Sequence, residues 1–133
     1  MSIFVDPNAF IDIELRYIEI KNSSEQVVGV KIIPEDAEPQ ENEKSISCKA
    51  LGRDYDNMSH ILEECTVINH ITGNPMLRTK VLMPMIVEKF FVSWDQLDEK
   101  EMMIPINRQT INKMFYQLVK KMASKWLLKT SVG

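Results

Sequence analysis

The sequence is short of the residues and runs that mark several common protein classes. It has four glycines, two cysteines and no uninterrupted apolar run approaching the length of a membrane helix, which is about 20 residues. The opening residues 1–7 lack the basic flank and long apolar core of an export signal. We therefore expect a soluble chain that reaches no membrane and lies in a reducing cytoplasm, where Cys48 and Cys65 stay free thiols.

Motifs that carry chemistry are equally scarce. The four glycines form no phosphate-binding loop. His60, Cys65 and His70 lack the close pairing of zinc ligands, and neither Ser59 with His60 nor Cys65 with His70 has the context that activates a nucleophile. The carboxylates of residues 95–101 fit a solvated connector. The sequence thus predicts a protein that is not an enzyme and that uses no cofactor or metal.

Composition and length fit one ordinary globular domain. Apolar residues make up 44% of the chain and charged residues 26%, as in typical folded domains, so we expect residues 1–133 to form a single domain. The net charge of −3 is uneven: residues 1–101 hold 10 cations and 19 acids (−9), and residues 102–133 hold six cations and no acid (+6). The two ends should therefore attract each other. A basic helix can bind nucleic acid, but a pI of about 5.4 opposes it and favours a solvated helix face.

The first part of the chain has the pattern of strands. Residues 10–20 alternate apolar and polar side chains, which predicts a half-buried strand. Residues 22–24 supply turn chemistry, and residues 27–33 form the returning strand of a hairpin. Residues 34–44, with two prolines and many acids, indicate a mobile surface loop. Residues 45–51 alternate weakly and predict a third short strand, since a lone hairpin is marginally stable.

Further along, the apolar period changes to that of helices. A helix of about four turns is predicted over residues 55–68, from a stripe made of Tyr55, Met58, Ile61, Leu62, Cys65 and Ile68. A second helix covers residues 76–92, where Pro84 would kink or split it. A third begins after the N-cap residue Asn107 and has an apolar face up to residue 126.

The order of these elements predicts the fold class. Residues 1–51 are mainly strands and an acidic loop, and residues 52–133 are helical, so we expect an α+β fold. It would contain an antiparallel β-hairpin or small three-stranded sheet followed by about three helices. The chain also has nine methionines, whose flexible side chains suit either a binding groove or an irregular core. The sequence is compatible with either interpretation.

The last 55 residues or so resemble tail assembly chaperones of long-tailed bacteriophages. They share a helix that contains Arg78-Thr79-Lys80, a Val-Ser-Trp-Asp junction, an acidic turn and an Ile-Pro-Ile-Asn start to the final helix. The resemblance is carried by Trp94, Asp95, Pro105 and Asn107. The connector lacks the glycine usual in that family, and the first 51 residues indicate strands where many such chaperones are helical.

The resemblance implies a phage protein that helps tail assembly in the host cytoplasm. It would bind the tape-measure protein, or other tail proteins, by reversible contacts without a cofactor, and would self-associate as a homo-oligomer. The partner-binding residues expected on the apolar face of the final helix are Met114, Leu118, Met122 and Trp126. A structural role is expected for Trp94, Pro105 and Asn107, with the Trp94 ring against the final helix and its indole N–H bonded to the connector.

Two other kinds of protein remain open. A virion structural component of the tail or connector would use edge strands of the amino-terminal sheet for ring contacts. A small regulator or host-directed inhibitor would engage a cellular protein or nucleic acid, and only the basic last helix favours it. All three hypotheses describe a molecule that acts by binding another macromolecule.

Overall fold

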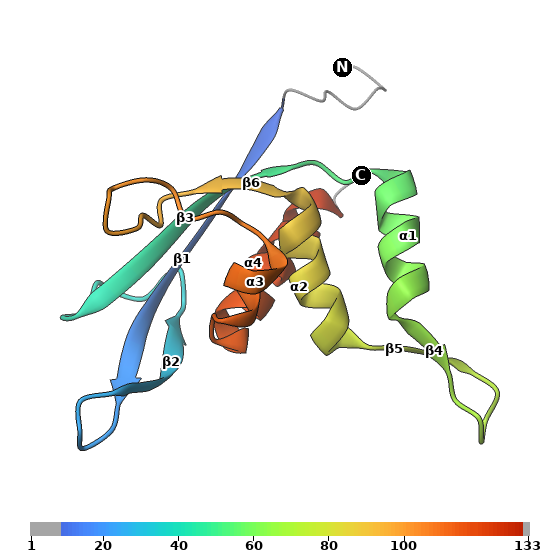
Figure 1. Ribbon diagram of the computed structural model, residues 1–133, viewed down its shortest axis with the longest axis horizontal. Coiled ribbons are helices and arrows are strands. Elements are labelled where there is room, and N and C mark those ends of the chain that lie inside the picture. Colours follow the sequence, from blue (N-terminus) through green and yellow to red (C-terminus); the bar gives the residue numbers. More distant parts are fainter. Residues whose placement is uncertain (1–8, 132–133) are drawn as a thin grey trace.

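The chain folds into a four-stranded antiparallel sheet covered by helices, as the computed structural model shows for residues 9–131 (Figure 1). The strands have the order β2-β1-β3-β6 and comprise β1 (Phe10–Lys21), β2 (Val27–Ile33), β3 (Glu43–Leu51) and β6 (Phe91–Trp94). The predicted α+β class is confirmed. Residues 1–7, on which the export argument rests, lie outside the described residues.

The β1–β2 hairpin and the third strand form where the sequence pattern places them. Along β1, buried Ile13 and Leu15 alternate with exposed Asp12 and Glu14. The side chain of Asn22 closes the turn, because its oxygen accepts from two backbone N–H groups, each at 3.0 Å. Strand β3 pairs antiparallel with the first part of β1. Strand β6, which has four residues and continues directly from a helix, was not predicted.

The helices are α1 (Tyr55–Cys65), α2 (Thr79–Phe90), α3 (Arg108–Asn112) and α4 (Tyr116–Thr130). The predicted helix over residues 55–68 is too long, because its last three residues form strand β4 (Thr66–Ile68). This strand pairs with β5 (Pro75–Leu77), so the second helix starts at residue 79 and not at residue 76. All three β4 residues are β-branched, which favours an extended backbone over a helix.

Helix α2 runs without a break through Pro84, so of the two effects expected of this proline, a kink or a split, the split does not occur. The single final helix predicted from Asn107 is instead two helices, separated at residues 113–115. Asn107 does cap the first of them, accepting the Thr110 N–H at 2.9 Å. The backbone of Phe115 is extended, so α4 starts afresh and packs along the sheet while α3 packs on α2.

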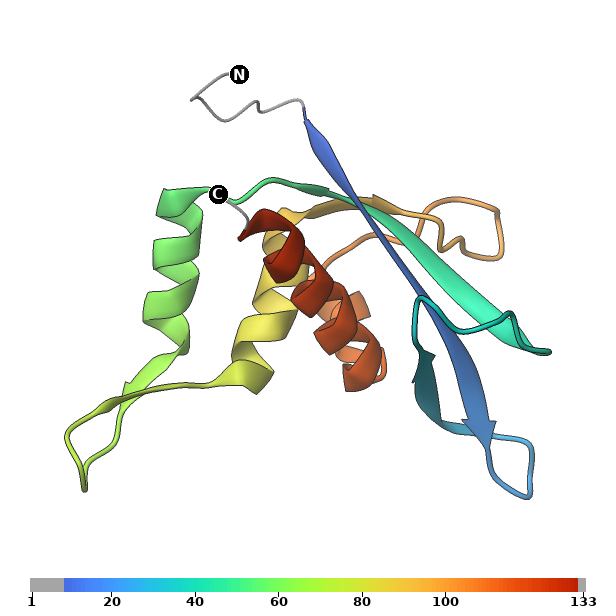
Figure 2. The same ribbon diagram turned by 180° about the vertical axis from the view of Figure 1, so that it is seen from behind.

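The molecule has layers that both ribbon views show (Figures 1 and 2). Helices α2 and α4 cover one face of the sheet, and α1 lies beyond them, against α2. The core between sheet and helices includes Ile13 and Ile46 from the strands and Phe90 and Trp126 from the helices. The β4–β5 hairpin extends from the ends of α1 and α2 past the rest of the fold. Within residues 9–131, no helix has both the length and the apolar character needed to cross a membrane.

The acidic segment between β2 and β3 is a loop, as predicted, but one that is held to the sheet. The Arg16 guanidinium donates to the backbone carbonyls of Pro34 and Ala37, at 2.8 and 2.7 Å. It also pairs with the Glu43 carboxylate at 2.7 Å. The polar composition of the segment predicted a mobile loop, and composition does not reveal this arginine anchor.

Candidate protein-interaction surface

The four residues predicted to bind a partner lie mostly inside the fold. Leu118, Met122 and Trp126 are buried, and Met114 is half-buried against the same core. The sequence identified the apolar face of the final helix, but that face covers the chain's own sheet and α2. In this fold these side chains therefore form no open surface for a second protein.

The residues expected to have a structural role fare differently. The indole N–H of Trp94 donates to the backbone carbonyl of Ile104 in the connector at 2.7 Å, the bond that the sequence analysis anticipated. The buried Trp94 ring also lines a small cavity with Leu118 from α4. Asn107 caps α3. Pro105 is exposed, between two residues that pack partly against the core, Ile104 and Ile106.

Groups that could carry chemistry are either buried or solvated. Both cysteines are buried free thiols. Burial raises the pKa of the Cys48 thiol to about 12, and it also raises the pKa of Cys65. His60 and His70 are exposed. In the part of the chain that the structure describes, no set of three His, Cys, Asp or Glu side chains could hold a metal ion.

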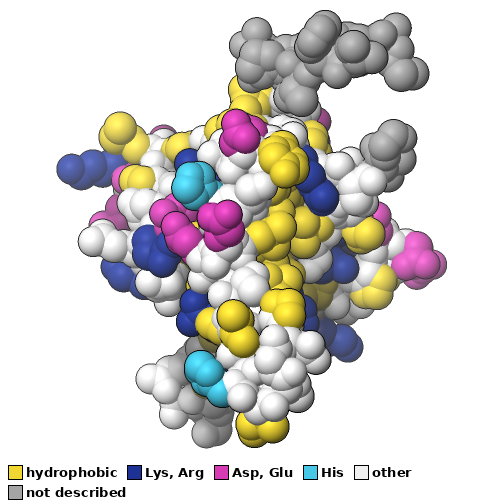
Figure 3. Space-filling model, turned by 90° about the vertical axis from the view of Figure 1, so that its right-hand side faces the viewer, with side chains coloured by type: hydrophobic (Ala, Val, Ile, Leu, Met, Phe, Trp, Pro, Cys, Tyr) yellow, Lys and Arg dark blue, Asp and Glu magenta, His cyan; other side chains and the backbone are white. Residues whose placement is uncertain are grey.

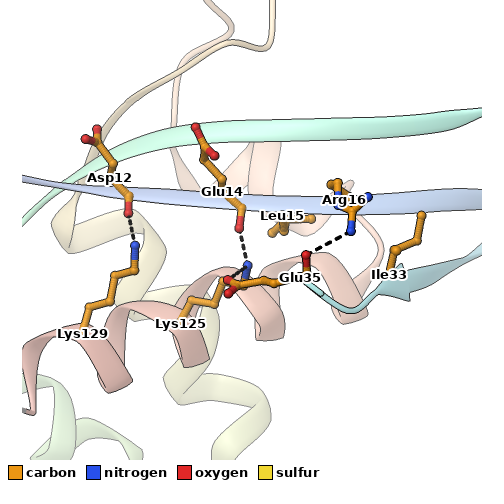
Figure 4. A pocket seen from close by; sticks show the side chains of 8 residues that line it. All are labelled: Asp12, Glu14, Leu15, Arg16, Ile33, Glu35, Lys125 and Lys129. Carbon is orange, nitrogen blue, oxygen red and sulfur yellow. Dashed lines mark hydrogen bonds and ion pairs between the residues drawn. The ribbon is translucent and has the colours of Figure 1, made fainter. Parts of the chain in front are cut away.

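A polar cleft of about 440 Å³ lies between β1 and α4 (Figure 4). The Lys125 ammonium donates to the Glu14 carbonyl and pairs with the Glu35 carboxylate at 2.6 Å. Lys129 donates to the Asp12 carbonyl at 2.6 Å. The attraction predicted between the acidic and basic parts of the chain is seen here. Lys125 and Lys129 are already bonded to groups of the chain itself, so the polar contacts in this cleft hold α4 against the sheet.

The same two lysines protect an open stretch of strand. Strand β2 pairs with β1 only from Arg16 onward, so the first half of β1 extends past the end of β2. The Asp12 and Glu14 carbonyls that accept from Lys129 and Lys125 belong to this half. Lysines placed along an uncovered strand edge satisfy its carbonyls and discourage pairing with another chain.

Exposed apolar side chains gather on the opposite side of the molecule, on α1. The relative exposure of Tyr55 is 84% and that of Leu62 is 39%, and their spacing of seven residues puts them on one side of the helix. Arg53, just before α1, bonds Thr130 and the Leu127 carbonyl at the end of α4. Exposed Leu128 therefore lies at this end too. We call Tyr55, Leu62 and Leu128 the α1 stripe.

The space-filling view of this side shows a band of apolar side chains with acidic side chains and a histidine along one flank (Figure 3). The acidic flank belongs to α1, where Asp56, His60 and Glu63 line one shallow depression. A surface that combines an apolar band with one charged flank can fix both the position and the orientation of a bound helix.

The β4–β5 hairpin continues the exposed apolar surface. All six residues of its two strands are exposed, and Ile71 in the connecting turn is also exposed. The turn is formed by Asn69, whose side-chain oxygen accepts from the Ile71 and Thr72 N–H groups, and by Gly73 with a positive φ of 74°. Together, α1 and the hairpin form what we call the arm.

The arm was not predicted, because the six apolar residues from Tyr55 to Ile68 were interpreted as one stripe of a single helix. Only Met58, Ile61 and Cys65 of that set are buried against the core. Tyr55 and Leu62 lie on the flank of this face, and Ile68 is in β4. A possible signal was the width of the apolar face, which exceeds what one neighbouring helix can cover.

Comparison with known proteins adds no further information. No protein family, curated protein or solved structure matches the chain.

Proposed function

We propose that this protein is a non-enzymatic interaction module, a tail assembly chaperone that binds an apolar helical segment of a phage tape-measure protein. The observation that carries the proposal is the exposure of Tyr55 and Leu62, two turns apart on one side of α1, next to an acidic flank. The resemblance of residues 78–133 to tail assembly chaperones suggests the partner, and the arm supplies a surface on which it can bind.

The energetics of the stripe fit reversible binding. Burying one fully exposed large apolar side chain contributes about 1.5–3 kcal/mol, and Leu62 is already partly covered, so Tyr55, Leu62 and Leu128 together supply part of a micromolar affinity. The acidic side chains Asp56 and Glu63 favour a segment that carries Lys or Arg beside its apolar face. A chaperone that must later release its client benefits from a contact of this modest size.

The test is capture of a co-expressed tape-measure protein from the same phage. The double substitution Tyr55→Ser with Leu62→Ser should lower the affinity at least tenfold, because it removes two apolar anchors. A matched control is Phe10→Ser with Val28→Ser, which changes two similarly exposed apolar residues of the sheet. Equal capture by wild type and the Tyr55/Leu62 variant would refute the stripe as the binding surface. No capture by the wild-type protein would refute the chaperone role.

A virion structural component is the second candidate, because both edges of the main sheet carry exposed apolar residues. Val28 lies on edge strand β2 and Val92 on edge strand β6. Open edges of this kind can pair with a neighbouring subunit in a ring. Mass spectrometry of purified particles separates the two roles, since a chaperone should be absent from them and a tail component present in fixed number.

A further inference from the structure

The β4–β5 hairpin has a defined hydrogen-bond register. Asn69 N–H donates to the Asn74 carbonyl at 2.9 Å, and Arg78 N–H donates to the Cys65 carbonyl at 2.8 Å. Val67, opposite Met76, lies midway between these two bonded positions. Bonded and non-bonded pairs alternate along an antiparallel ladder, so Val67 and Met76 form a bonded pair and their neighbours do not. The backbone groups of Thr66 and Ile68 therefore point away from β5. The outer edge of β4 thus presents two N–H and two C=O groups in the register of a further strand.

The two edges of the hairpin are not equivalent. On β5 the outward-facing positions are Pro75 and Leu77, and proline has no N–H to donate. Proline is a common protection of a strand edge against pairing. Strand β4 has no such protection: Thr66, Val67 and Ile68 are all β-branched, uncharged and exposed. An added strand is therefore directed to β4.

The hairpin is also too small to be stable by itself, and the rest of the chain leaves its strands exposed. Each strand has three residues, and an isolated two-stranded hairpin is marginally stable in water. Apolar side chains occupy both of its faces, with Val67 and Met76 on one and Ile68 and Leu77 on the other. Figure 1 shows the hairpin beyond the rest of the fold, where a second molecule can reach it.

We propose that two copies of this chain associate through their β4 edges, in antiparallel orientation, to form a four-stranded sheet with the order β5-β4-β4-β5. Thr66 of each copy pairs with Ile68 of the other, which forms four backbone hydrogen bonds. Val67 lies on the two-fold axis, opposite its own symmetry mate. The interface is isologous, as expected for a closed dimer.

The charges near the hairpin allow this arrangement. In the antiparallel pairing, the acidic end of α1 in one copy, with Glu63 and Glu64, lies beside the 69–74 turn of the other. The ionisable side chain in that turn is His70. The pairing therefore opposes no acid with an acid. The two Val67 and two Met76 side chains form one continuous apolar face across the dimer.

The proposal is separate from the α1 stripe. Tyr55 and Leu62 are on α1, outside the paired strands, and Tyr55 begins α1, at the end of the helix away from the dimer contact. A failure of dimerisation and a failure of tape-measure capture are consequently distinguishable, because the first is read from Val67 variants and the second from the Tyr55/Leu62 variant.

Disulfide trapping tests the predicted symmetry. Both native cysteines are buried, so Val67→Cys introduces a single exposed thiol. Across a non-bonded antiparallel pair the Cα atoms are about 4.5 Å apart, within disulfide range. Met76→Cys is the matched control, because it is on the same face of the hairpin but its symmetry mate is about three strand spacings away, roughly 14 Å. Mild oxidation of full-length protein should give at least ten times more linked dimer for Val67→Cys. Equal yields for the two variants would overturn the proposal.

A charge-swap experiment gives an independent readout that needs no introduced cysteine. Val67→Asp and Val67→Lys each place two like charges opposite one another, so each variant alone should be monomeric by sedimentation velocity. An equimolar mixture should recover the wild-type dimer. The proposal is overturned if the wild-type protein stays monomeric over a 100-fold range of protein concentration. It is also overturned if the mixture of the two variants does not associate. Circular dichroism of each variant checks that α1 and the sheet are retained.

Discussion

The rings of Phe90 and Trp126 stack with their centroids 4.4 Å apart and their planes at 24°. Phe90 ends α2, and Trp126 is near the end of α4, so this contact joins the two helices that cover the sheet. The Trp126 indole N–H also donates to the Leu51 carbonyl of β3 at 2.7 Å. A single side chain thus connects both helices and the sheet.

Substitution of Trp126 should show the two parts of this contact separately. The Trp126 side chain is 0% exposed, so Trp126→Ala leaves a large cavity in the core. This substitution should lower the free energy of unfolding by about 3–5 kcal/mol. Trp126→Phe keeps most of the ring but leaves the Leu51 carbonyl without its donor, at a cost of about 1–3 kcal/mol. Urea unfolding followed by circular dichroism measures both. Leu128→Ala, an exposed position on α4, is the control and should change stability by less than about 0.5 kcal/mol.

Replacement of Pro84 should stabilise the protein. Pro84 lies inside α2 and has no N–H to bond the Lys80 carbonyl one turn earlier. Proline in a helix interior costs about 3 kcal/mol relative to alanine, and its restriction of the unfolded chain offsets up to about 1 kcal/mol of that. We expect Pro84→Ala to raise the free energy of unfolding by about 1–2 kcal/mol. Pro105→Ala, outside the helices, should give no such gain, and a destabilised Pro84→Ala protein would show that packing requires the proline geometry.

The fastening of α4 to β1 should depend on Lys125 much more than on Glu35. Lys125 is buried, with 9% exposure, and bonds the Glu14 carbonyl, whereas the Glu35 side chain is 78% exposed. Lys125→Met retains the apolar stem but leaves that carbonyl without its donor, which should cost about 1–3 kcal/mol. Glu35→Gln should cost far less, because exposed ion pairs are screened by water. Similar losses for both variants would contradict this ranking.

The contribution of the Glu35–Lys125 pair should vanish in acid. The hydrogen bond from Lys125, together with its charge, holds the pKa of Glu35 below the ordinary value of 4.5. A carboxyl whose pKa is lowered by folding stabilises the fold above its unfolded pKa, and this contribution is lost as the pH falls through the lowered value. The difference in stability between wild type and Glu35→Gln should therefore be constant from pH 6 to 7 and close to zero near pH 2. A difference that grows in acid would reverse the assigned sign.

Both cysteines should be unreactive until the protein unfolds. With a pKa of about 12, the Cys48 thiol is ionised in about one molecule in 10,000 at pH 8, and the thiolate is the reactive form. Cys65 is buried as well, with its sulfur 3.5 Å from that of Met85. Titration with a thiol-reactive disulfide at pH 8 should detect both thiols rapidly in denaturant and only slowly in native protein. Rapid native labelling would show that the core opens locally.

The sequence by itself determined the local structure of most of the chain. The alternation in residues 10–20 and 27–33, with turn residues between them, defined the hairpin, because a strand exposes every second side chain to water. The N-cap of Asn107 and the apolar face of the last helix were also predicted from the sequence. The uneven distribution of acids and lysines predicted the attraction now seen between Lys125 and Glu35.

Only the tertiary structure decided which apolar faces are covered. The face with Leu118, Met122 and Trp126 and the flank with Tyr55 and Leu62 look alike in sequence, yet the first is buried under the sheet and the second is open. Their difference depends on how far α1 lies from the sheet, which neither period nor composition records. Strand β6 and the β4–β5 hairpin were hidden for a related reason, because strands of three or four residues are too short to show a period and exist only where a partner strand is brought alongside.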